Sequence, residues 1–230
     1  MVKQTQQVHE AEALRYAPII TTMTDAAAKT LLAASTLLTL PAGKVLLSQA
    51  QVPSAVYLVQ TGILRHIYYN ATGTDAGLGM IGSGHWVGLG SLYGLPPSGT
   101  VEALGESRVH KIEPQTLHNI MADNPKIAGA FHALTLQQSL DTQKRLCQMM
   151  TLSVAERLAH CLLRLARDFG RETEQGLYLD VPLTRSHLAD LVGTRLETVS
   201  RTLSQWEREG LVVSRRQKVW IVQQKQLASL

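Results

Sequence analysis

Three polar residues near the C-terminal end of the chain stand at the spacing of one helical face. Glu197, Ser200 and Arg201 occupy positions i, i+3 and i+4, which meet on the surface of an α-helix. A carboxylate accepts a hydrogen bond from cytosine N4, and a guanidinium donates two hydrogen bonds to O6 and N7 of guanine. The residue types and their spacing therefore fit the reading of base edges in the major groove of DNA.

Two of these residues also have a purely structural interpretation. Thr194 and Glu197 form the T-x-x-E pattern of a capping box, in which the glutamate accepts a hydrogen bond from a backbone N–H at the start of a helix. For Arg201 the alternative is a solvated surface charge. We favour base reading for both and keep these roles as alternatives.

The flanking sequence predicts two helices that would position this face. Thr184 fits the N-cap of a short helix through Leu191. Gly193 follows where the chain must turn, and glycine takes a positive φ without penalty. The second helix is expected to begin near Thr194 and to bury three apolar side chains at spacings of four and three: Val199, Leu203 and Trp206. Two short helices around a glycine turn predict a helix-turn-helix.

A basic hairpin is expected after the second helix. "LVVSRRQKVWIV" reads as two β runs around the tip Arg215-Arg216-Gln217-Lys218, and its cations suit phosphate oxygens. The net charge is +4, and after Glu209 the chain has four basic residues and no acidic one. This local excess favours a polyanionic partner. We interpret the hairpin as the wing of a winged helix; a solvated turn is the alternative.

The N-terminal half predicts a different architecture. Residues 38–113 hold short β-type runs separated by glycine turns, which indicates a small antiparallel barrel or roll. From 115 to about 148 the apolar residues recur at helical spacing, with a break at Asn124-Pro125. We expect this long helix to pair with a second copy, and the expected dimer residues are Ile127, Phe131, Leu134 and Gln138. The fold class is therefore α+β.

Nearly the whole chain resembles the cyclic-AMP receptor protein and FNR family of bacterial transcription regulators. The resemblance rests on "LPAGKVLLSQAQVPSAVYLVQTGILRHI" (40–67), "SVAERLAHCLLRLA" (153–166) and the segment 183–212. It implies an N-terminal sensor domain over 1–114, with a cyclic-nucleotide-binding-like β-roll (a double-stranded β-helix). A dimerisation helix and hinge over 115–150 and a winged helix-turn-helix over 151–230 would follow.

The resemblance also implies how DNA would be bound. Glu197, Ser200 and Arg201 match the family's E-x-x-S-R pattern, and the aliphatic Leu196 resembles the FNR branch, which implies a TTGA-type half-site. Double-stranded DNA, a second copy of the chain and RNA polymerase are the implied partners. The candidate phosphate contacts are Thr184, Arg185, Ser186, Thr194, Arg195, Thr198, Arg215, Arg216 and Lys218.

The glycine-rich loop "GSGHWVGLGSLYGLPPSGTVE" (82–102) departs from the family pattern. It stands where the family binds the cyclic phosphate, yet Leu89 replaces the carboxylate and Pro97 stands where the arginine is expected. No Lys or Arg occurs between Arg65 and Arg108, and a buried phosphate without a cation is costly. The sequence therefore disfavours cyclic AMP. The candidate pocket for another small-molecule effector comprises Trp86, Leu89, Gly90, Ser91, Leu92, Tyr93, Ser98 and Thr100.

Other sensing chemistries stay open to different degrees. An iron–sulfur cluster is disfavoured because no cysteine precedes Cys147. Haem remains an alternative, with an axial ligand from one of four histidines: His9, His66, His85 or His110. Cys147 and Cys161 as redox-sensing thiols, and a roll with no effector at all, complete the alternatives. No metal site is expected, since the two cysteines form no CxxC pair.

Composition excludes several other classes of protein. The first residues lack a signal-peptide pattern, and the apolar stretch "LLAASTLLTL" is too short to span a bilayer. We therefore expect a cytoplasmic protein without membrane contact. A cupin-like β-roll enzyme is disfavoured because His85 has no HxH partner, so no catalytic residue is assigned. The sequence does not identify the effector, the target genes, the exact operator or the direction of regulation.

Overall fold

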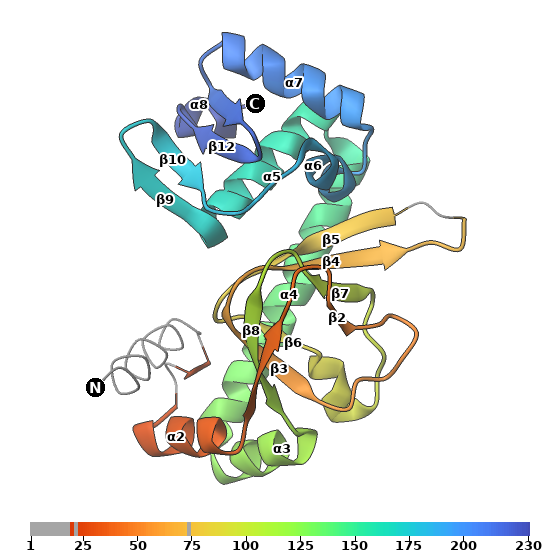
Figure 1. Cartoon of the computed structure of the whole chain (residues 1–230), viewed down its shortest axis with the longest axis vertical. Helices are drawn as coiled ribbons and strands as arrows, with labels where there is room; N and C mark the ends of the chain where they lie inside the picture. The colour runs from red at the N-terminus through yellow and green to blue at the C-terminus, as the bar shows by residue number, and fades with distance from the viewer. Residues whose placement is uncertain (1–18, 21–22, 73–74) are drawn as a thin grey trace. The chain divides into compact units, whose positions relative to one another are not determined.

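The computed structural model describes residues 19–20, 23–72 and 75–230 (Figure 1). The chain forms two compact units. The first comprises the described residues up to Tyr68 together with Met80–Asp141, and the second comprises Tyr69–Gly79 and Thr142–Leu230. The segment 115–150 contributes residues to both units, up to Asp141 in the first and from Thr142 in the second.

Two four-stranded sheets form the first unit, except that Tyr69 of strand β4 and Asp75–Gly79 of strand β5 are grouped with the second unit. One sheet has the strand order β1-β8-β3-β6 and the other has the order β2-β7-β4-β5. All neighbouring strands of the first sheet pair antiparallel, and so do β2 with β7 and β7 with β4 in the second. The strands are β1 (Thr36–Leu40), β2 (Val45–Leu47), β3 (Val56–Thr61), β4 (Leu64–Tyr69), β5 (Asp75–Ile81), β6 (Trp86–Val87), β7 (Thr100–Ala103) and β8 (Ser107–Ile112). The expected antiparallel β-roll is confirmed.

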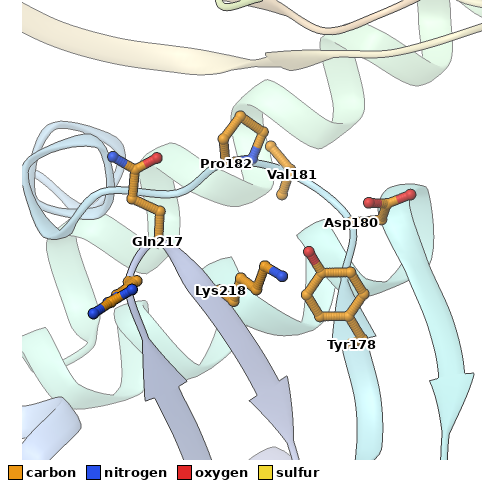
Figure 2. Close-up of a pocket in the computed structure, with 7 residues that line it drawn as sticks. Tyr178, Asp180, Val181, Pro182, Gln217 and Lys218 are labelled. Carbon is orange, nitrogen blue, oxygen red and sulfur yellow. The ribbon is translucent and has the colours of Figure 1, made fainter.

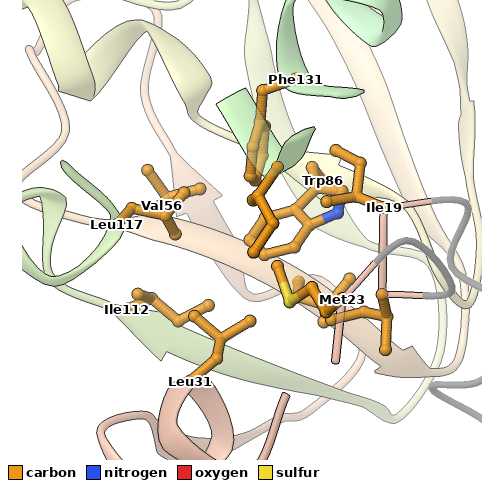
Figure 3. Close-up of a cluster of buried hydrophobic side chains, with 11 residues drawn as sticks. Ile19, Met23, Leu31, Val56, Trp86, Ile112, Leu117 and Phe131 are labelled. Atoms are coloured by element: carbon orange, nitrogen blue, oxygen red, sulfur yellow. The ribbon is translucent and has the colours of Figure 1, made fainter. Parts of the chain in front are cut away.

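Strand β3 supplies two hydrophobic cores because its side chains alternate between the faces of its sheet. Tyr57 and Val59 enter a core shared by both sheets, with contributions from β1, β2, β4, β6, β7 and β8. Val56 and Leu58 enter a second core on the other face of the sheet, where helices pack (Figure 3). Burial on both faces explains why this strand reads as a continuous apolar run.

Three helices cover the second core. Helix α2 (Asp25–Ala33) begins at Thr24, whose hydroxyl accepts a hydrogen bond from Ala27 N at 3.2 Å. Helix α3 (Pro114–Asp123) and the 27-residue α4 (Pro125–Thr151) follow, separated by Asn124. The break expected at Asn124-Pro125 is confirmed, and its cause is that proline disfavours helical backbone at the residue before it.

Two of the four predicted dimer residues on α4 are buried within their own chain, whereas Leu134 is half-buried and Gln138 is exposed. Ile127 and Phe131 are 0% and 4% exposed, and with Leu134 they pack into the second core of their own chain. At 100° per residue, Gln138 continues that same face. The opposite face carries exposed apolar side chains, with relative exposures of 62% for Leu136, 49% for Leu140 and 78% for Met150. Cys147 is exposed on that face too.

The second unit contains a three-helix core and a small sheet. Its elements are α5 (Val154–Phe169), β9 (Gly170–Thr173), β10 (Gly176–Leu179), α6 (Arg185–Val192), α7 (Leu196–Arg208), β11 (Val212–Arg215), β12 (Lys218–Ile221) and α8 (Gln224–Ala228). The sheet order is β11-β12-β10-β9. Gly170 ends α5, as predicted. No helix in the described residues is long and apolar enough to cross a membrane.

Candidate nucleic-acid interface

Helix α6 is fixed at both ends by the residues that the sequence singles out. The Thr184 hydroxyl accepts a hydrogen bond from His187 N at 3.0 Å, and His187 Nδ1 accepts one from Thr184 N at 3.4 Å. These reciprocal bonds form a capping box. At the other end Gly193 has φ +69°, in the left-handed region that only glycine adopts without strain. The predicted N-cap and turn are confirmed.

Helix α7 begins one residue later than expected, which removes the capping role of Glu197. Its N-cap is Arg195, which makes no side-chain capping bond. Thr194 lies outside the helix and is followed by the N-cap, so Thr194 and Glu197 do not form a capping box. That structural alternative is wrong. The predicted buried face is confirmed: Val199, Leu203 and Trp206 are 0%, 0% and 3% exposed.

The opposite face of α7 presents the three residues considered for base reading. Glu197 and Arg201 are exposed, and Ser200 is half-buried. None of the hydrogen bonds of the described chain uses the side chain of any of these three residues. A carboxylate, a hydroxyl and a guanidinium therefore remain available, on one face of a helix, for groups outside the chain.

Five of the candidate phosphate contacts lie at the starts of α6 and α7. Arg185 and Ser186 form the first turn of α6, and Thr194 and Arg195 lie in the turn before α7. Thr198 is in the first turn of α7. Main-chain and side-chain donors at the starts of two helices are suited to phosphate oxygens.

Strands β11 and β12 form the expected wing around the basic tip. Arg215 pairs with Lys218, and the two residues between them, Arg216 and Gln217, have φ values of +43° and +70°. Two central residues with positive φ are typical of a type I′ hairpin turn. The Gln217 carbonyl accepts a hydrogen bond from Leu183 N at 3.1 Å. The turn is thus anchored to the segment that leads into α6.

A carboxylate joins the wing to the other end of α7. Glu207 Oε1 accepts a hydrogen bond from Ser214 N at 2.8 Å. The wing is therefore held at two places, by Gln217 to the start of α6 and by Ser214 to α7. Sequence reasoning missed this role of Glu207, because an exposed-looking glutamate on a helix gives no signal of a strand that packs beside it.

A shallow hollow of about 280 Å³ lies beside the wing turn, open to solvent (Figure 2). Lys218, Gln217 and Arg216 line one side, and Tyr178 and Asp180 line the other. The Asp180 carboxylate is paired with Arg171 at 2.7 Å. This pairing offsets the negative charge of Asp180. The cations of the wing therefore leave the hollow with a net positive charge.

Comparison with known proteins matches both halves of this architecture. Residues 156–230 match the model of a Crp-like helix-turn-helix domain, and residues 37–124 match the model of a cyclic nucleotide-binding domain. The match to the cyclic nucleotide-binding domain precedes the match to the helix-turn-helix domain, just as the β-roll precedes the helix-turn-helix along the chain. The chain belongs to the Crp/Fnr family of transcription regulators.

Individual members of the family are distant in sequence. A CRP-like cAMP-activated global transcriptional regulator of Mycobacterium tuberculosis is 23% identical over 82% of this chain and 84% of its own. The transcriptional activator protein FnrA of Stutzerimonas stutzeri is 23% identical over 82% of this chain and 77% of its own. The structure of FixK2 from Bradyrhizobium japonicum superposes with a TM-score of 0.77 at 22% identity, covering 85% and 96% of the two chains.

In this Crp/Fnr regulator the glycine-rich loop does not gather the predicted pocket residues. Trp86 is 5% exposed and packs edge-on against Phe131, with ring centroids 5.0 Å apart, in the core beneath the helices. Figure 3 shows both side chains in that core. Leu89 and Leu92 pack against the same core, and Tyr93 is 65% exposed. Three of the four side chains thus share one core with the helices and Tyr93 faces solvent, and an effector pocket at this loop stays a prediction.

The remaining predicted pocket residues divide between the interior and the solvent. Ser91, in the short 3-10 helix η2 (Leu89–Tyr93), and Thr100 are buried. Ser98 is exposed and Gly90 is half-buried. Helix η2 is tied to α3 by a 3.0 Å hydrogen bond between His118 Nε2 and the Leu92 carbonyl.

The last cation before the loop in the sequence, Arg65, is already paired. Arg65 on β4 donates to Glu102 on β7, with Nη2 and Oε1 2.7 Å apart. Glu102 stands between Val101 and Ala103, which face the core shared by the two sheets. Because neighbouring side chains in a strand alternate, the Arg65–Glu102 pair lies on the other face.

Two of the histidines considered as haem ligands lie within hydrogen-bond distance of an oxygen atom of the chain. His110 Nδ1 lies 2.8 Å from Ser35 Oγ, and His85 Nδ1 lies 3.2 Å from the Gly82 carbonyl. His9 lies outside the described residues. No group of three metal-ligating side chains occurs within 19–20, 23–72 and 75–230. Burial raises the pKa of the Cys161 thiol, which disfavours the reactive thiolate.

Proposed function

We propose that this Crp/Fnr regulator binds DNA as a homodimer and reads an inverted repeat with TTGA-type half-sites. The observation that carries the proposal is the face of α7, where Glu197, Ser200 and Arg201 have no partner within the described chain. Leu196, 46% exposed beside them, is the residue type of the FNR branch. Two-fold symmetry of a dimer requires half-sites related by inversion, about one turn of DNA apart.

Fluorescence anisotropy with labelled duplexes tests this reading. We expect the full chain to prefer a TTGA-type palindrome over a TGTGA-type palindrome and over a scrambled duplex, at several salt concentrations. Arg201→Ala removes one bidentate guanine contact, worth about 1–3 kcal/mol, from each half-site. It should therefore weaken binding to the palindrome by at least roughly 30-fold and leave binding to scrambled DNA unchanged. Arg208→Ala is the matched control, because Arg208 lies in the last turn of the same helix and its Nε donates to the Ser204 carbonyl.

Two results would contradict the proposal. The first is equal affinity of the wild-type protein for palindromic and scrambled DNA at every salt concentration. The second is an equal loss for Arg201→Ala on all duplexes, which would make Arg201 a phosphate contact.

We also propose that the β-roll has lost cyclic-nucleotide binding and responds to another small molecule or to none. The proposal is supported by Leu89 in place of a carboxylate, by the absence of Lys and Arg between Arg65 and Arg108, and by the engagement of Arg65 with Glu102. Isothermal titration of the full chain with cyclic AMP should give no heat of binding at micromolar concentrations. Saturable binding with a dissociation constant in that range would overturn this part.

We propose that regulation proceeds through RNA polymerase in the cytoplasm. We also propose that the exposed stripe of α4 forms the dimer contact. Leu136, Leu140, Gln143, Cys147 and Met150 follow each other at alternating spacings of four and three, the pattern of a two-stranded helical seam. Whether bound protein recruits or blocks the polymerase is decided by transcription in vitro from a template that carries the site.

A further inference from the structure

One arginine of α5 connects the two places where the helix-turn-helix meets the end of α4. Arg157 Nε donates to the Val192 carbonyl at 3.2 Å, and Arg157 Nη1 donates to the Leu152 carbonyl at 3.0 Å. Val192 is the last residue of α6, and Leu152 lies in the hinge between α4 and α5. All three residues belong to the second unit.

Both acceptors are carbonyls that a helix end leaves without an intrahelical donor. The N–H groups of Gly193 and Thr194, which follow α6, both go to the Ala189 carbonyl, so they do not serve Val192. The guanidinium of Arg157 therefore donates hydrogen bonds to both carbonyls, that of Val192 at the end of α6 and that of Leu152 in the hinge after α4. A guanidinium holds several donors in one rigid plane, so the two bonds fix the two carbonyls relative to each other.

A second contact at the same place comes from α4 itself. A Cβ added to Gly193 would lie 3.1 Å from Met149 Cε, so the last turn of α4 lies directly against the turn between α6 and α7. The hinge, α4 and α5 thus converge on residues 192–193. This is the short turn from which α7 departs.

We propose that Arg157 is a positioning residue for DNA reading: it locks the α6–α7 turn to the hinge and so sets the direction in which each protomer presents α7. The inference rests on the proposed dimeric reading of an inverted repeat. Arg157 lies on α5, outside the face that carries Glu197 and Arg201, so it acts through those residues. In a dimer, two rigidly held helices fit one half-site spacing, whereas two loosely held helices tolerate several.

The test compares three duplexes by anisotropy with the full chain: the palindrome, the palindrome lengthened by one central base pair, and a single half-site. We expect wild type to lose at least about tenfold in affinity on the lengthened palindrome. Arg157→Met keeps the length of the side chain and removes the donors. On the palindrome, the affinity of Arg157→Met should be about tenfold below that of wild type, because two charged hydrogen bonds are lost. Between the palindrome and the lengthened palindrome, the affinity of the variant should fall by less than about threefold. Its affinity for the single half-site should stay within about twofold of wild type.

Arg167→Met and Arg157→Lys complete the design. Arg167 lies on the same helix and pairs only with its neighbour Asp168, at 3.1 Å, in an exposed position, so the wild-type spacing preference should persist. Arg157→Lys keeps the positive charge, but its donors sit on a single nitrogen, so it does not hold both carbonyls as the guanidinium does. It should give an intermediate spacing preference. It also decides the question if Arg157→Met does not fold, which thermal unfolding reports.

The outcomes separate this inference from the proposed function. An equal loss for Arg157→Met on all three duplexes, or an unchanged spacing preference for either Arg157 variant, would overturn the positioning role. A wild-type protein that shows no preference for the palindrome over the single half-site would instead overturn the dimeric reading on which the inference rests.

Discussion

The residues proposed to read DNA are recognisable because their chemistry is local to one helix. The spacing of Glu197, Ser200 and Arg201 places them on one face whatever the rest of the chain does, and the buried face of α7 is set by the same period. Roles that depend on another element give no such signal. Arg157, Glu207 and Met149 act on carbonyls, N–H groups or turns that come from elsewhere in the chain.

The carboxylate of Glu207 should stabilise the fold through its bond to Ser214 N. Replacement Glu207→Ala leaves a partly buried N–H without an acceptor, and we expect a loss of about 1–3 kcal/mol in the free energy of unfolding. Glu207→Gln keeps an acceptor oxygen and should recover most of it. Glu209→Ala is the control, because Glu209 is exposed and bonds only to Gln205. Equal urea midpoints for Glu207→Ala and Glu209→Ala would contradict the role.

The two cysteines should differ sharply in reactivity. Cys147 is exposed, whereas Cys161 is buried and its pKa is raised by that burial, so its reactive thiolate is scarce. Because Cys147 lies in the proposed dimer seam, the labelling is carried out on the monomeric Leu140→Glu variant. At pH 8 an excess of a maleimide should label one thiol per chain of this variant, and adding Cys147→Ser should abolish the labelling. Denatured protein should take up two labels. Labelling of native Cys147→Ser at the rate of the denatured protein would mean that Cys161 is accessible.

At the scale of elements, the sequence predicts what each segment is more reliably than what it packs against. The β-roll, the break before α4, the helix-turn-helix and the wing all follow from local patterns. The partner of α4 does not, because the helix has two apolar stripes on opposite faces. One stripe contains Phe131 and the other Leu140, and only the position of the roll core decides which is covered. The sequence likewise does not decide which core Trp86 enters, since β6 has a core on each face.

The capping box of α5 should contribute a pH-dependent part of the stability. Hydrogen bonds from the Ser153 side chain and backbone lower the pKa of Glu156 below its usual 4.5. A carboxyl with a lowered pKa in the folded state stabilises the protein above pH 4.5, and the contribution is lost as the pH falls through the folded value. Thermal unfolding should therefore show wild type above Glu156→Gln at pH 7, with the gap closing below pH 4.5. Ser153→Ala should remove this pH dependence, and a gap that stays constant from pH 7 to pH 3 would disprove it.

Gly193 should tolerate no side chain. Its φ of +69° is strained for any residue with a Cβ, and an added Cβ would approach Met149 Cε to 3.1 Å. We expect Gly193→Ala to cost about 1–3 kcal/mol in the free energy of unfolding. Gly210→Ala is the matched control, since Gly210 has φ +70° and a Cβ added there would come no closer than 3.9 Å to its nearest neighbour, Gln223 Nε2. The backbone cost is then shared by both variants, and any excess for Gly193→Ala reports the contact with α4. An excess of zero would show that Met149 moves aside freely.

At the scale of the whole molecule, the function depends on two copies. A single helix-turn-helix reads one half-site, and a dimer gains specificity because both half-sites must be correct at the right spacing. The exposed stripe of α4 is suited to join the copies, because apolar side chains of the size of Leu136, Leu140 and Met150 gain most by leaving water.

Leu140→Glu should therefore separate the protomers. The substitution removes two leucines from the seam of a dimer and places two like charges there, which we expect to cost about 3 kcal/mol or more. That cost corresponds to a rise of at least about 100-fold in the dissociation constant of the dimer. Sedimentation velocity at micromolar concentration should show monomers for Leu140→Glu and dimers for Thr135→Glu, which places the same charge on an exposed flank of the same helix. Binding to the palindrome should fall with dimerisation, while binding to a single half-site should stay, because α7 is untouched. A dimeric Leu140→Glu would place the contact between copies on another surface of the chain.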